Sequence, residues 1–211
     1  PILDLGYTSF VGLHSIPVRH GKTIGELARL FKAERFPSCE LYVMEMENYD
    51  KRMWFDETGL PWVMPSPNMP TLDTAIVYPG MCLLEATNVS EGRGTTRPFE
   101  IFGAPFIDAE KLCRYMNGLK LPGVLFRENY FQPTFHKGAG SICGGAQIHV
   151  LDRNVFRSFD MTIKLLQYLF HEYPNDLAWK APPYEYEFEK LPIDILLGSG
   201  TFRKEFIESG L

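Results

Sequence analysis

A polar run held between two apolar segments is the feature that most constrains how this chain can fold. The run extends from Glu85 to Glu100 and carries Glu91, Arg93 and Arg97. The segments on its two sides read AIVYPGMCLL and PFEIFGAPFI, so we expect both ends of the run to be anchored in a hydrophobic core. A polar loop that is held rigidly at both ends is a frequent place for a functional site.

The residue types in this loop suit a polar ligand. Gly92 and Gly94 flank Arg93, so the backbone is uncrowded on either side and positive φ is allowed. Carboxylates can transfer protons, and a guanidinium binds anionic or hydroxyl-rich groups with paired hydrogen bonds. A solvated turn, in which the charges only pair with one another, is the alternative explanation. The apolar flanks favour the site.

Length and charge exclude several classes of protein. With 211 residues, of which 45% are hydrophobic and 14% aromatic, the chain can bury a core and is not expected to be disordered. The net charge of −5 argues against general nucleic-acid binding, which needs a basic surface. No stretch approaches the roughly 20 apolar residues of a membrane span. Because the sequence begins at Pro1 without a methionine, we expect processing or a fragment, and a missing signal peptide says little about compartment.

The spacing of the four cysteines predicts neither a metal site nor a catalytic thiol. Cys39, Cys82, Cys113 and Cys143 lie far apart, and no CxxC or HxxxH pair accompanies them. Each lies in an apolar setting, where a buried free thiol is the usual state. We therefore expect no metal and no cofactor.

The first 46 residues predict an incomplete α/β unit. Residues 1–22 read as extended, and Thr23 and Glu26 have the spacing of a capping box. Apolar residues at helical spacing then predict a helix over 23–34, and the run ELYVMEM predicts a buried strand over 40–46. A parallel sheet needs partner strands that this stretch does not supply, so we expect the unit to be the edge of a larger layer.

The remainder of the chain predicts an α+β domain over residues 47–211. It opens on a stiff, proline-rich loop over 47–70, in which Asn68 is the best candidate for a ligand contact. Helices are expected over 71–84 with an interruption at Pro79 and Gly80, over 109–119 after a cap at Asp108, and over 158–173. Strands are expected over 99–107, 123–135 and 147–151.

Arg19 and His20 form a second candidate site, just before the helix predicted from residue 23. Backbone donors and the dipole at a helix N-terminus favour anions, so both side chains are candidate ligand contacts. A histidine that only caps or packs in this loop is an equally good interpretation.

Several long and uncommon strings are spread along the chain. They are IPVRHGKTIGELARLF, TGLPWVMPSPNMPTLDTAIVYPG, CLLEATNVSEGRGTTRPFEIFGAPFI, YFQPTFHK, GGAQIHVLDR and DILLGS. Together they resemble the bacterial exo-β-N-acetylmuramidase family NamZ, and the resemblance runs from about Ser9 to the end of the chain.

The resemblance implies a fold, a substrate and a location. Members have a Rossmann-like N-terminal domain and a smaller C-terminal domain, with the active site in the cleft between them. They remove N-acetylmuramic acid from the non-reducing ends of peptidoglycan fragments, outside the cytoplasm. Residues 1–46 would be the last α/β unit of the Rossmann-like domain, and residues 47–211 would be the C-terminal domain. Most of the upstream domain, with a catalytic glutamate, would precede this chain.

The chemistry of glycoside hydrolysis points to the same loop. It commonly uses two carboxyl groups, one as the acid and one as the nucleophile or base. Glu91 and Glu85 are the candidates, with His20 as a third catalytic candidate, and we expect Glu91 to be the more exposed of the two glutamates. An N-acetyl group on the substrate can itself act as the nucleophile, so a second protein carboxylate is not obligatory.

Substrate binding is expected to involve arginines. Muramic acid carries a lactyl carboxylate, for which Arg93, Arg97 or Arg19 would be a bidentate partner. Asn88 and Asn68 are further candidate contacts to the sugar.

Two other functions use the same residues. A non-catalytic module that binds an anionic sugar or a cell-wall fragment would need the same arginines and glutamates. A phosphate-binding loop at SEGRGTT is disfavoured, because neither GxxxxGK[ST] nor a GxGxxG run after a strand is present. An open reading frame that extends upstream into a βαβ-rich half would favour the hydrolase.

Overall fold

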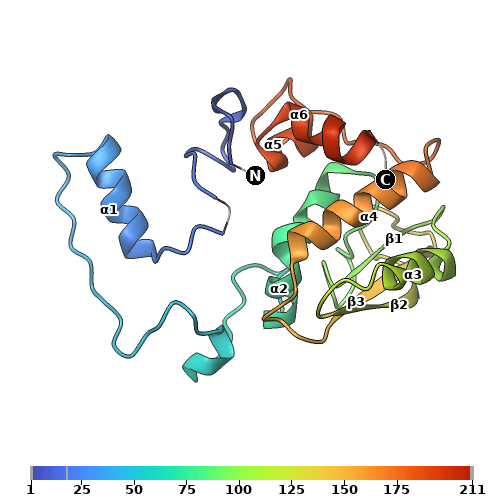
Figure 1. Cartoon of the computed structure of the whole chain (residues 1–211), viewed down its shortest axis with the longest axis horizontal. Coiled ribbons are helices and arrows are strands. Elements are labelled where there is room, and N and C mark those ends of the chain that lie inside the picture. The colour runs from blue at the N-terminus through green and yellow to red at the C-terminus, as the bar shows by residue number, and fades with distance from the viewer. Residues whose placement is uncertain (1, 18, 210–211) are drawn as a thin grey trace. The chain divides into compact units, whose positions relative to one another are not determined.

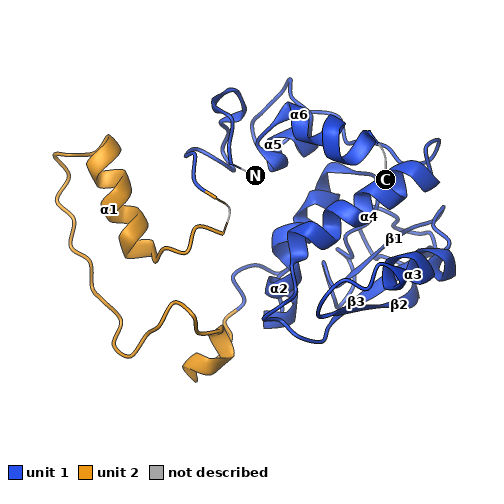
Figure 2. Ribbon diagram, in the orientation of Figure 1, with its two compact units in different colours: residues 1–16, 64–211 blue, residues 17–63 orange. Residues whose placement is uncertain are grey.

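The computed structural model of the chain describes residues 2–17 and 19–209, which form two compact units. The main unit comprises residues 1–16 and 64–211, and the small unit comprises residues 17–63 (Figure 2). The predicted domain boundary after residue 46 concerns the architecture of a longer protein. It stays a prediction.

The small unit contains the helix that the sequence predicts. Helix α1 spans Ile24–Arg35 (Figure 1). Its capping box is formed, because the Thr23 hydroxyl accepts from the Glu26 N–H at 3.1 Å and the Glu26 carboxylate accepts from the Thr23 N–H at 2.9 Å. Two orphan backbone donors are thereby satisfied, which fixes where the helix begins. A short 3-10 turn follows at Phe55–Thr58.

The predicted strand over 40–46 is wrong for this structure. These residues have no regular secondary structure, and Tyr42 and Met44 are 85% and 92% exposed. A strand needs a neighbour to satisfy its backbone N–H and C=O groups, and none of the described residues pairs with this run. The apolar pattern is present without its hydrogen-bonding partner.

The main unit is built on a three-stranded antiparallel sheet. Strands β1 (Ile101–Ala104) and β2 (Val124–Phe131) both pair with the central strand β3 (Cys143–Val150). Directly opposite residues share a face of the sheet, and the pairs Phe102–Ala146 and Phe126–Ile148 are all buried. One face of the sheet is therefore part of the hydrophobic core. Pro133 follows the edge strand β2, where a missing donor is tolerated.

Three helices complete this core (Figure 1). Helix α2 spans Leu72–Met81, α3 spans Ala109–Gly118 and α4 spans Ser158–Glu172. As predicted, the Asp108 carboxylate caps α3 by accepting from the Lys111 N–H at 3.0 Å. The main unit packs several helices and a three-stranded antiparallel sheet around one core. This is an α+β arrangement, which confirms the predicted fold class.

Helix α2 crosses α4 at a glycine. A Cβ at Gly80 would lie 2.2 Å from the Ser158 carbonyl oxygen, and the Gly80 N–H donates to the Ser158 hydroxyl at 2.8 Å. The predicted interruption at Pro79 is wrong, because the helix continues through Pro79 to Met81. The chain then tightens into the 3-10 segment Cys82–Ala86, called η3.

The C-terminal part adds short helices to the main unit. Helix α5 spans Pro192–Leu197, α6 spans Gly200–Phe202, and a π-helical turn covers Arg203–Glu208. The buried Arg203 guanidinium donates to both carboxylate oxygens of Asp194, at 2.8 and 3.2 Å, and fixes these helices to one another. In residues 2–17 and 19–209 no helix has the length and apolar character that crossing a membrane requires.

The cysteines of the described residues form no disulfide. Cys113 and Cys143 are buried as expected, and burial raises the pKa of the Cys113 thiol to about 11. Cys39 is exposed, so the expectation of burial is wrong there. Its segment lies in the small unit, next to the run that lacks a strand partner. Among these same residues, no cluster of three metal-ligating side chains is present.

Candidate functional site

The polar loop is anchored as the sequence predicts. Val89 and Phe99 within the loop are fully buried, and Ser90 exchanges two backbone hydrogen bonds with Gly103 of β1, at 2.9 and 3.0 Å. The segment η3 presents Glu85 at the start of the loop. The loop is therefore a fixed part of the core edge.

The two glycines serve packing more than ligand access. Gly92 and Gly94 have φ values of +78° and +81°, which side chains rarely adopt. A Cβ at Gly92 would lie 2.4 Å from the Ile101 carbonyl oxygen, and one at Gly94 would lie 2.8 Å from backbone atoms of Phe135. Glycine is required because two backbone segments meet here.

Glu91 is the centre of a buried ionic network. Its side chain is fully buried, and its carboxylate accepts from Lys137 Nζ at 2.8 Å and from Arg93 Nε at 2.9 Å. Burial alone would raise the pKa of Glu91, but the Lys137 ammonium and Arg93 guanidinium hold it below the ordinary 4.5. Glu91 is thus ionised at neutral pH. The expectation that Glu91 is more exposed than Glu85 is wrong, since the Glu85 side chain is 17% exposed.

Arg93 connects Glu91 to Glu85. Its Nη2 donates to Glu85 Oε1 at 2.8 Å, and its guanidinium lies 5.2 Å from the centre of the Phe99 ring. The other oxygen of Glu85 accepts from the Tyr184 hydroxyl at 3.1 Å. Burial and the nearby Glu85 raise the pKa of Tyr184, so this phenol stays a donor. The arrangement holds the guanidinium plane in one orientation, with 25% of the side chain exposed.

Lys137 fixes the network to the backbone of the loop. Its ammonium donates to the carbonyl oxygens of Leu84 and Val89, at 2.8 and 3.2 Å, in addition to Glu91. All three donors of the ammonium are thereby used. Burial lowers the pKa of Lys137, and the charge of Glu91 opposes that shift.

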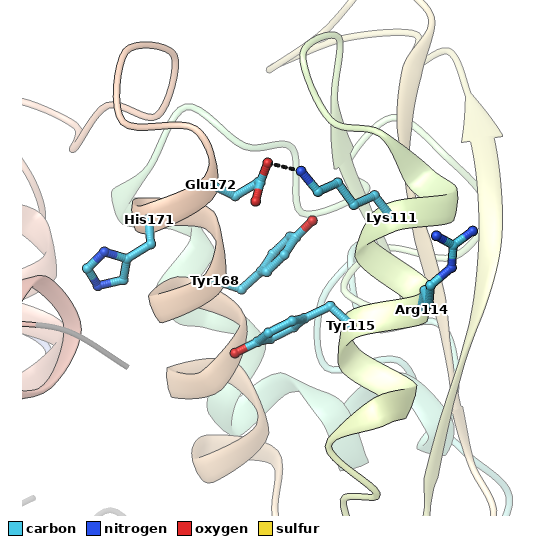
Figure 3. A pocket seen from close by; sticks show the side chains of 6 residues that line it. All are labelled: Lys111, Arg114, Tyr115, Tyr168, His171 and Glu172. Atoms are coloured by element: carbon cyan, nitrogen blue, oxygen red, sulfur yellow. Dashed lines mark hydrogen bonds and ion pairs between the residues drawn. The ribbon is translucent and has the colours of Figure 1, made fainter.

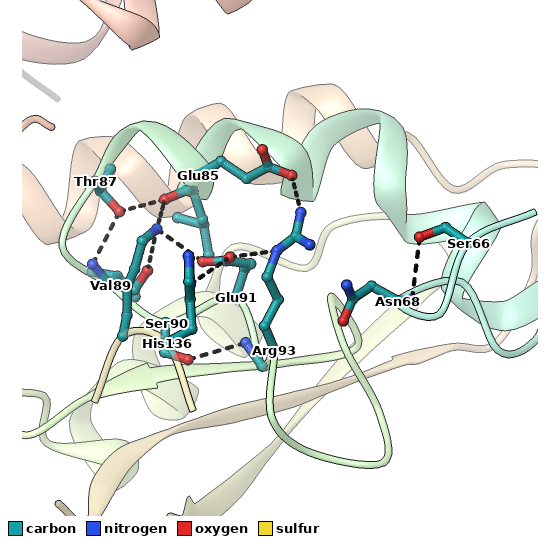
Figure 4. A network of polar contacts seen from close by, with 12 residues as sticks. Ser66, Asn68, Glu85, Thr87, Val89, Ser90, Glu91, Arg93 and His136 are labelled. Atoms are coloured by element: carbon teal, nitrogen blue, oxygen red, sulfur yellow. Dashed lines mark hydrogen bonds and ion pairs between the residues drawn. The ribbon is translucent and has the colours of Figure 1, made fainter. Parts of the chain in front are cut away.

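His136 is the most exposed member of the network. Its Nδ1 lies 3.5 Å from Glu91 Oε1, and 47% of the side chain is exposed. Its backbone is in the left-handed region, with φ of +70°. Figure 4 shows His136, Glu91 and Arg93 beside one another, with Glu85 beyond the guanidinium.

Sequence reasoning missed His136, Lys137 and Tyr184. The first two end the string YFQPTFHK, which carries part of the family resemblance and is the local signal for them. Lys137 is 46 positions from Glu91, and Tyr184 is 99 positions from Glu85, so no local pattern reveals these contacts.

Other predicted site residues lie in different settings. The Asn88 amide donates to the Asp176 carbonyl oxygen at 2.8 Å and accepts from the Ala178 N–H at 3.0 Å. Both ends of this amide hold a neighbouring loop. Asn68 is half-buried, and Figure 4 shows its side chain directed toward the part of the network that contains Arg93.

Arg97 belongs to a separate polar pocket of about 280 Å³. Its Nη1 donates at 3.0 Å to Glu100, whose buried carboxylate also accepts from the Thr74 hydroxyl at 2.7 Å. Asp73 and His149 also line the pocket. The two candidate arginines of the loop therefore face different surroundings.

Arg19 and His20 lie in the small unit, which is described by itself. Arg19 is exposed, and the half-buried His20 accepts from the Lys22 N–H through Nδ1 at 3.1 Å. This local contact fits the interpretation of a histidine that caps its own loop. A ligand role for either residue stays a prediction.

A larger pocket, of about 400 Å³, lies between α3 and α4 and contains none of the predicted site residues (Figure 3). The stacked rings of Tyr115 and Tyr168 form one wall, with centroids 4.5 Å apart. Lys111 and Glu172 form an ion pair over it. Size alone therefore does not select the candidate site.

Comparison with known proteins assigns the chain to a family. The model of the N-terminal part of exo-β-N-acetylmuramidase NamZ matches residues 1–73, and the model of its C-terminal part matches residues 76–210. The chain belongs to the NamZ family. The network around Glu91 lies in the part that the C-terminal family model matches.

Individual relatives agree with this assignment. The chain is 46% identical, over 210 residues, to the peptidoglycan β-N-acetylmuramidase NamZ of Bacillus subtilis strain 168, and the alignment covers 100% of this chain and 49% of that protein. This chain therefore spans about half the length of that relative.

Two crystal structures of DUF1343 family proteins from Bacteroides fragilis NCTC 9343 are similar to the whole chain. The first is 32% identical to this chain with a TM-score of 0.84, and the match covers 97% of this chain and 53% of that protein. The second is 27% identical to this chain with a TM-score of 0.64, and the match covers 100% of this chain and 54% of that protein.

Proposed function

We propose that this chain is part of an exo-acting peptidoglycan β-N-acetylmuramidase, which releases N-acetylmuramic acid from the non-reducing ends of peptidoglycan fragments. The observation that carries the proposal is the 46% identity, along the whole chain, to a protein named for that activity. The polar network around Glu91 contains a guanidinium that can bind an anionic group of the sugar.

Arg93 is the residue that we assign to the lactyl carboxylate of the sugar. A guanidinium has five N–H donors, and the hydrogen bonds to Glu91 and Glu85 use one at Nε and one at Nη2. The remaining donors and the partial exposure of the side chain leave a carboxylate room to bind. Two fixed carboxylates hold the guanidinium plane, so little side-chain entropy is lost when the ligand binds.

Glu91 and Glu85 then act through Arg93. An ionised, fully buried carboxylate has no proton to donate to a glycosidic oxygen, so we assign Glu91 the role of positioning Arg93. The general acid would be the glutamate that the family resemblance places upstream. Catalytic roles for Glu91, Glu85 and His20 stay predictions, and a variant of Glu91 tests the central one below.

The upstream part that we propose is a Rossmann-like domain, of which residues 1–46 form the last α/β unit. The relative from Bacillus subtilis is about twice as long as this chain. In the small unit, a Cβ at Gly25 of α1 would lie 2.6 Å from the side chain of Val43, so one side of the run 40–46 already packs on a helix. Strands from an upstream domain would supply the missing backbone partners of this run.

A periplasmic or extracellular location is part of the same proposal, because peptidoglycan lies outside the cytoplasmic membrane. Fractionation of cells that express the full-length protein would test it, with a cytoplasmic enzyme as the control.

The decisive experiment is a glycosidase assay of the full-length protein. We expect release of the aglycone from an aryl β-N-acetylmuraminide and little release from the matching β-N-acetylglucosaminide, which lacks the lactyl carboxylate. Absence of turnover on both glycosides would contradict the hydrolase. Saturable binding of the muraminide without turnover would instead favour a non-catalytic sugar-binding module.

A further inference from the structure

Hydrogen bonds on both sides of His136 fix the position of its backbone. The backbone N–H and hydroxyl of Thr134 both donate to the Gly94 carbonyl oxygen, at 3.0 and 2.9 Å. On its other side, Lys137 is fixed by three acceptors. Between these anchors His136 adopts a φ of +70°, a conformation that costs a side-chain-bearing residue free energy. The surrounding contacts determine where this imidazole lies.

The charges of the network are balanced without His136. Glu85 and Glu91 contribute two negative charges, and Arg93 and Lys137 contribute two positive charges. A guanidinium that already faces two carboxylates attracts a third one weakly. The network therefore has the hydrogen-bond donors for an anion but lacks the net positive charge that would hold it.

We propose that His136 is a further ligand-binding residue, and that its protonated imidazole gives the network the positive charge with which it holds the carboxylate of an N-acetylmuramic acid unit. The proposal rests on the proposed function, because it names a second contact at the same anionic group. Nδ1 of His136 lies 3.5 Å from Glu91 Oε1, and the described residues provide no hydrogen-bond partner for Nε2. The free nitrogen is the donor offered to the ligand.

The other charged groups near His136 do not change state between pH 5.5 and 8.5. The pKa of Glu91 lies below the ordinary value of a carboxyl group, so Glu91 is ionised over this range. Arg93 is always charged. Lys137 donates to three acceptors, which requires the ammonium form.

Two more distant charges border the network and oppose each other. The positive charge of Lys180 lowers the pKa of Lys137, and the negative charge of Glu185 raises the pKa of Tyr184. Protonation of the His136 imidazole adds one positive charge to the described network.

The sign of the pH dependence follows directly. An anion favours the protonated imidazole over the neutral one, so binding is tighter at low pH than at high pH. Where the free protein holds the imidazole neutral, a proton must be taken up on binding, and the affinity falls by up to about tenfold per pH unit. The ligand carboxylate, with a pKa near 3.5, stays ionised throughout.

The experiment measures the affinity of the full-length protein for free N-acetylmuramic acid, by calorimetry, from pH 5.5 to 8.5 at constant ionic strength. We expect the Kd of the wild type to rise across this range by about tenfold or more. N-acetylglucosamine, which lacks the carboxylate, is the ligand control and should bind with a constant Kd.

His136→Asn is the test variant, because asparagine tolerates the left-handed backbone better than other residues do. We expect its Kd for N-acetylmuramic acid to be constant within twofold and equal to the weak value of the wild type at pH 8.5. His171→Asn is the matched control, since His171 is exposed at the end of α4 and outside the network, and it should retain the wild-type pH dependence.

Three results would overturn the inference. They are a wild-type Kd that does not change with pH, a His136→Asn variant that keeps the slope, and an absence of N-acetylmuramic acid binding at every pH. The glycosidase assay separates these from failure of the proposed function. Turnover of the muraminide with pH-independent binding would remove only the role of His136, whereas absence of turnover would remove the muramidase.

Discussion

A fully buried carboxylate is stable at Glu91 because each of its oxygens faces a cation. Removing a charge from water costs several kcal/mol, and the attraction between buried charges offsets that cost only when geometry and hydrogen bonding are good. Here Lys137 is bonded to three oxygens, and Arg93 is held by a second carboxylate, Glu85. The same contacts that stabilise the loop therefore hold the guanidinium plane in one orientation.

Glu91→Gln is expected to lower stability more than turnover. Removing one partner of a buried ion pair costs about 3–5 kcal/mol, and we expect the lower end because the glutamine oxygen can still accept one hydrogen bond. A general acid would instead cost about 10²–10⁴-fold in kcat. Measuring the melting temperature and the kcat of the full-length variant distinguishes the two roles. Glu100→Gln is the matched control, because Glu100 is also a buried carboxylate but pairs with Arg97.

A large loss of kcat with an unchanged melting temperature would restore Glu91 to a catalytic role. Acid conditions offer an independent check of the same contact. The folded-state pKa of Glu91 lies below its ordinary value of 4.5, so its stabilising effect is complete above pH 4.5 and is lost as the pH falls below that value. The stability difference between wild type and Glu91→Gln, measured by urea unfolding, should therefore shrink from pH 7 to pH 3.

Arg93→Lys and Arg97→Lys form a matched pair. Lysine keeps the charge but cannot reproduce the planar set of donors, so Arg93→Lys should weaken binding of N-acetylmuramic acid by roughly tenfold or more, the value of one hydrogen bond to a charged group. Arg97 is 46% exposed and pairs with Glu100 in another pocket, so Arg97→Lys should change the Kd by less than about twofold. The reverse result in calorimetry would assign the carboxylate to Arg97.

At the scale of elements, the loop depends on close approach of backbones. Gly94→Ala should lower the free energy of unfolding by about 1–3 kcal/mol from the left-handed backbone alone, and the contact with Phe135 adds to this cost. Gly118→Ala is the control, because Gly118 lies in helix α3 with open space around it and should gain up to about 1 kcal/mol. Thermal unfolding of the two variants would contradict this view if Gly94→Ala were as stable as the wild type.

Elements whose signals are local could be predicted from the sequence. The capping box at Thr23 and the cap at Asp108 fixed two helix starts, because the atoms that satisfy each backbone donor lie within three residues. The strand over 40–46 could not be decided in this way, since a strand is completed by hydrogen bonds from a neighbour that no local pattern supplies. Apolar alternation indicates a surface to be covered but not what covers it.

The candidate site shows the same division. The sequence pattern located the loop and its arginines, since charge and flanking apolar runs are local properties. Which carboxylate is buried could not be predicted, because burial of Glu91 depends on Lys137, which is 46 positions away. The expectation that the backbone beside Arg93 is uncrowded was wrong for a similar reason, because a Cβ at Gly94 would meet backbone atoms of Phe135.

At the scale of the whole molecule, the small unit exposes what a larger assembly would cover. Tyr42 and Met44 are almost fully exposed, whereas Val43 packs against Gly25 of α1. A run with one side on a helix and the other side uncovered has the pattern of a strand in a layered α/β domain. The exposed side is therefore where we expect contacts with the upstream domain that we propose.

Amide hydrogen exchange tests this placement directly. In this chain the amides of residues 40–46 lack strand partners and should exchange rapidly, whereas in the full-length protein we expect protection by about tenfold or more, because each amide would then donate within a sheet. The amides of β3 are the internal control, since this central strand pairs on both sides in the chain alone and its protection should be high in both proteins.

Met44→Glu supplies a second measurement. At 92% exposure the substitution should leave this chain as stable as before, while in the full-length protein it would bury a carboxylate and lower the melting temperature. Rapid exchange of residues 40–46 in both proteins, together with an unchanged melting temperature of the full-length variant, would show that this run is not a strand of the upstream domain.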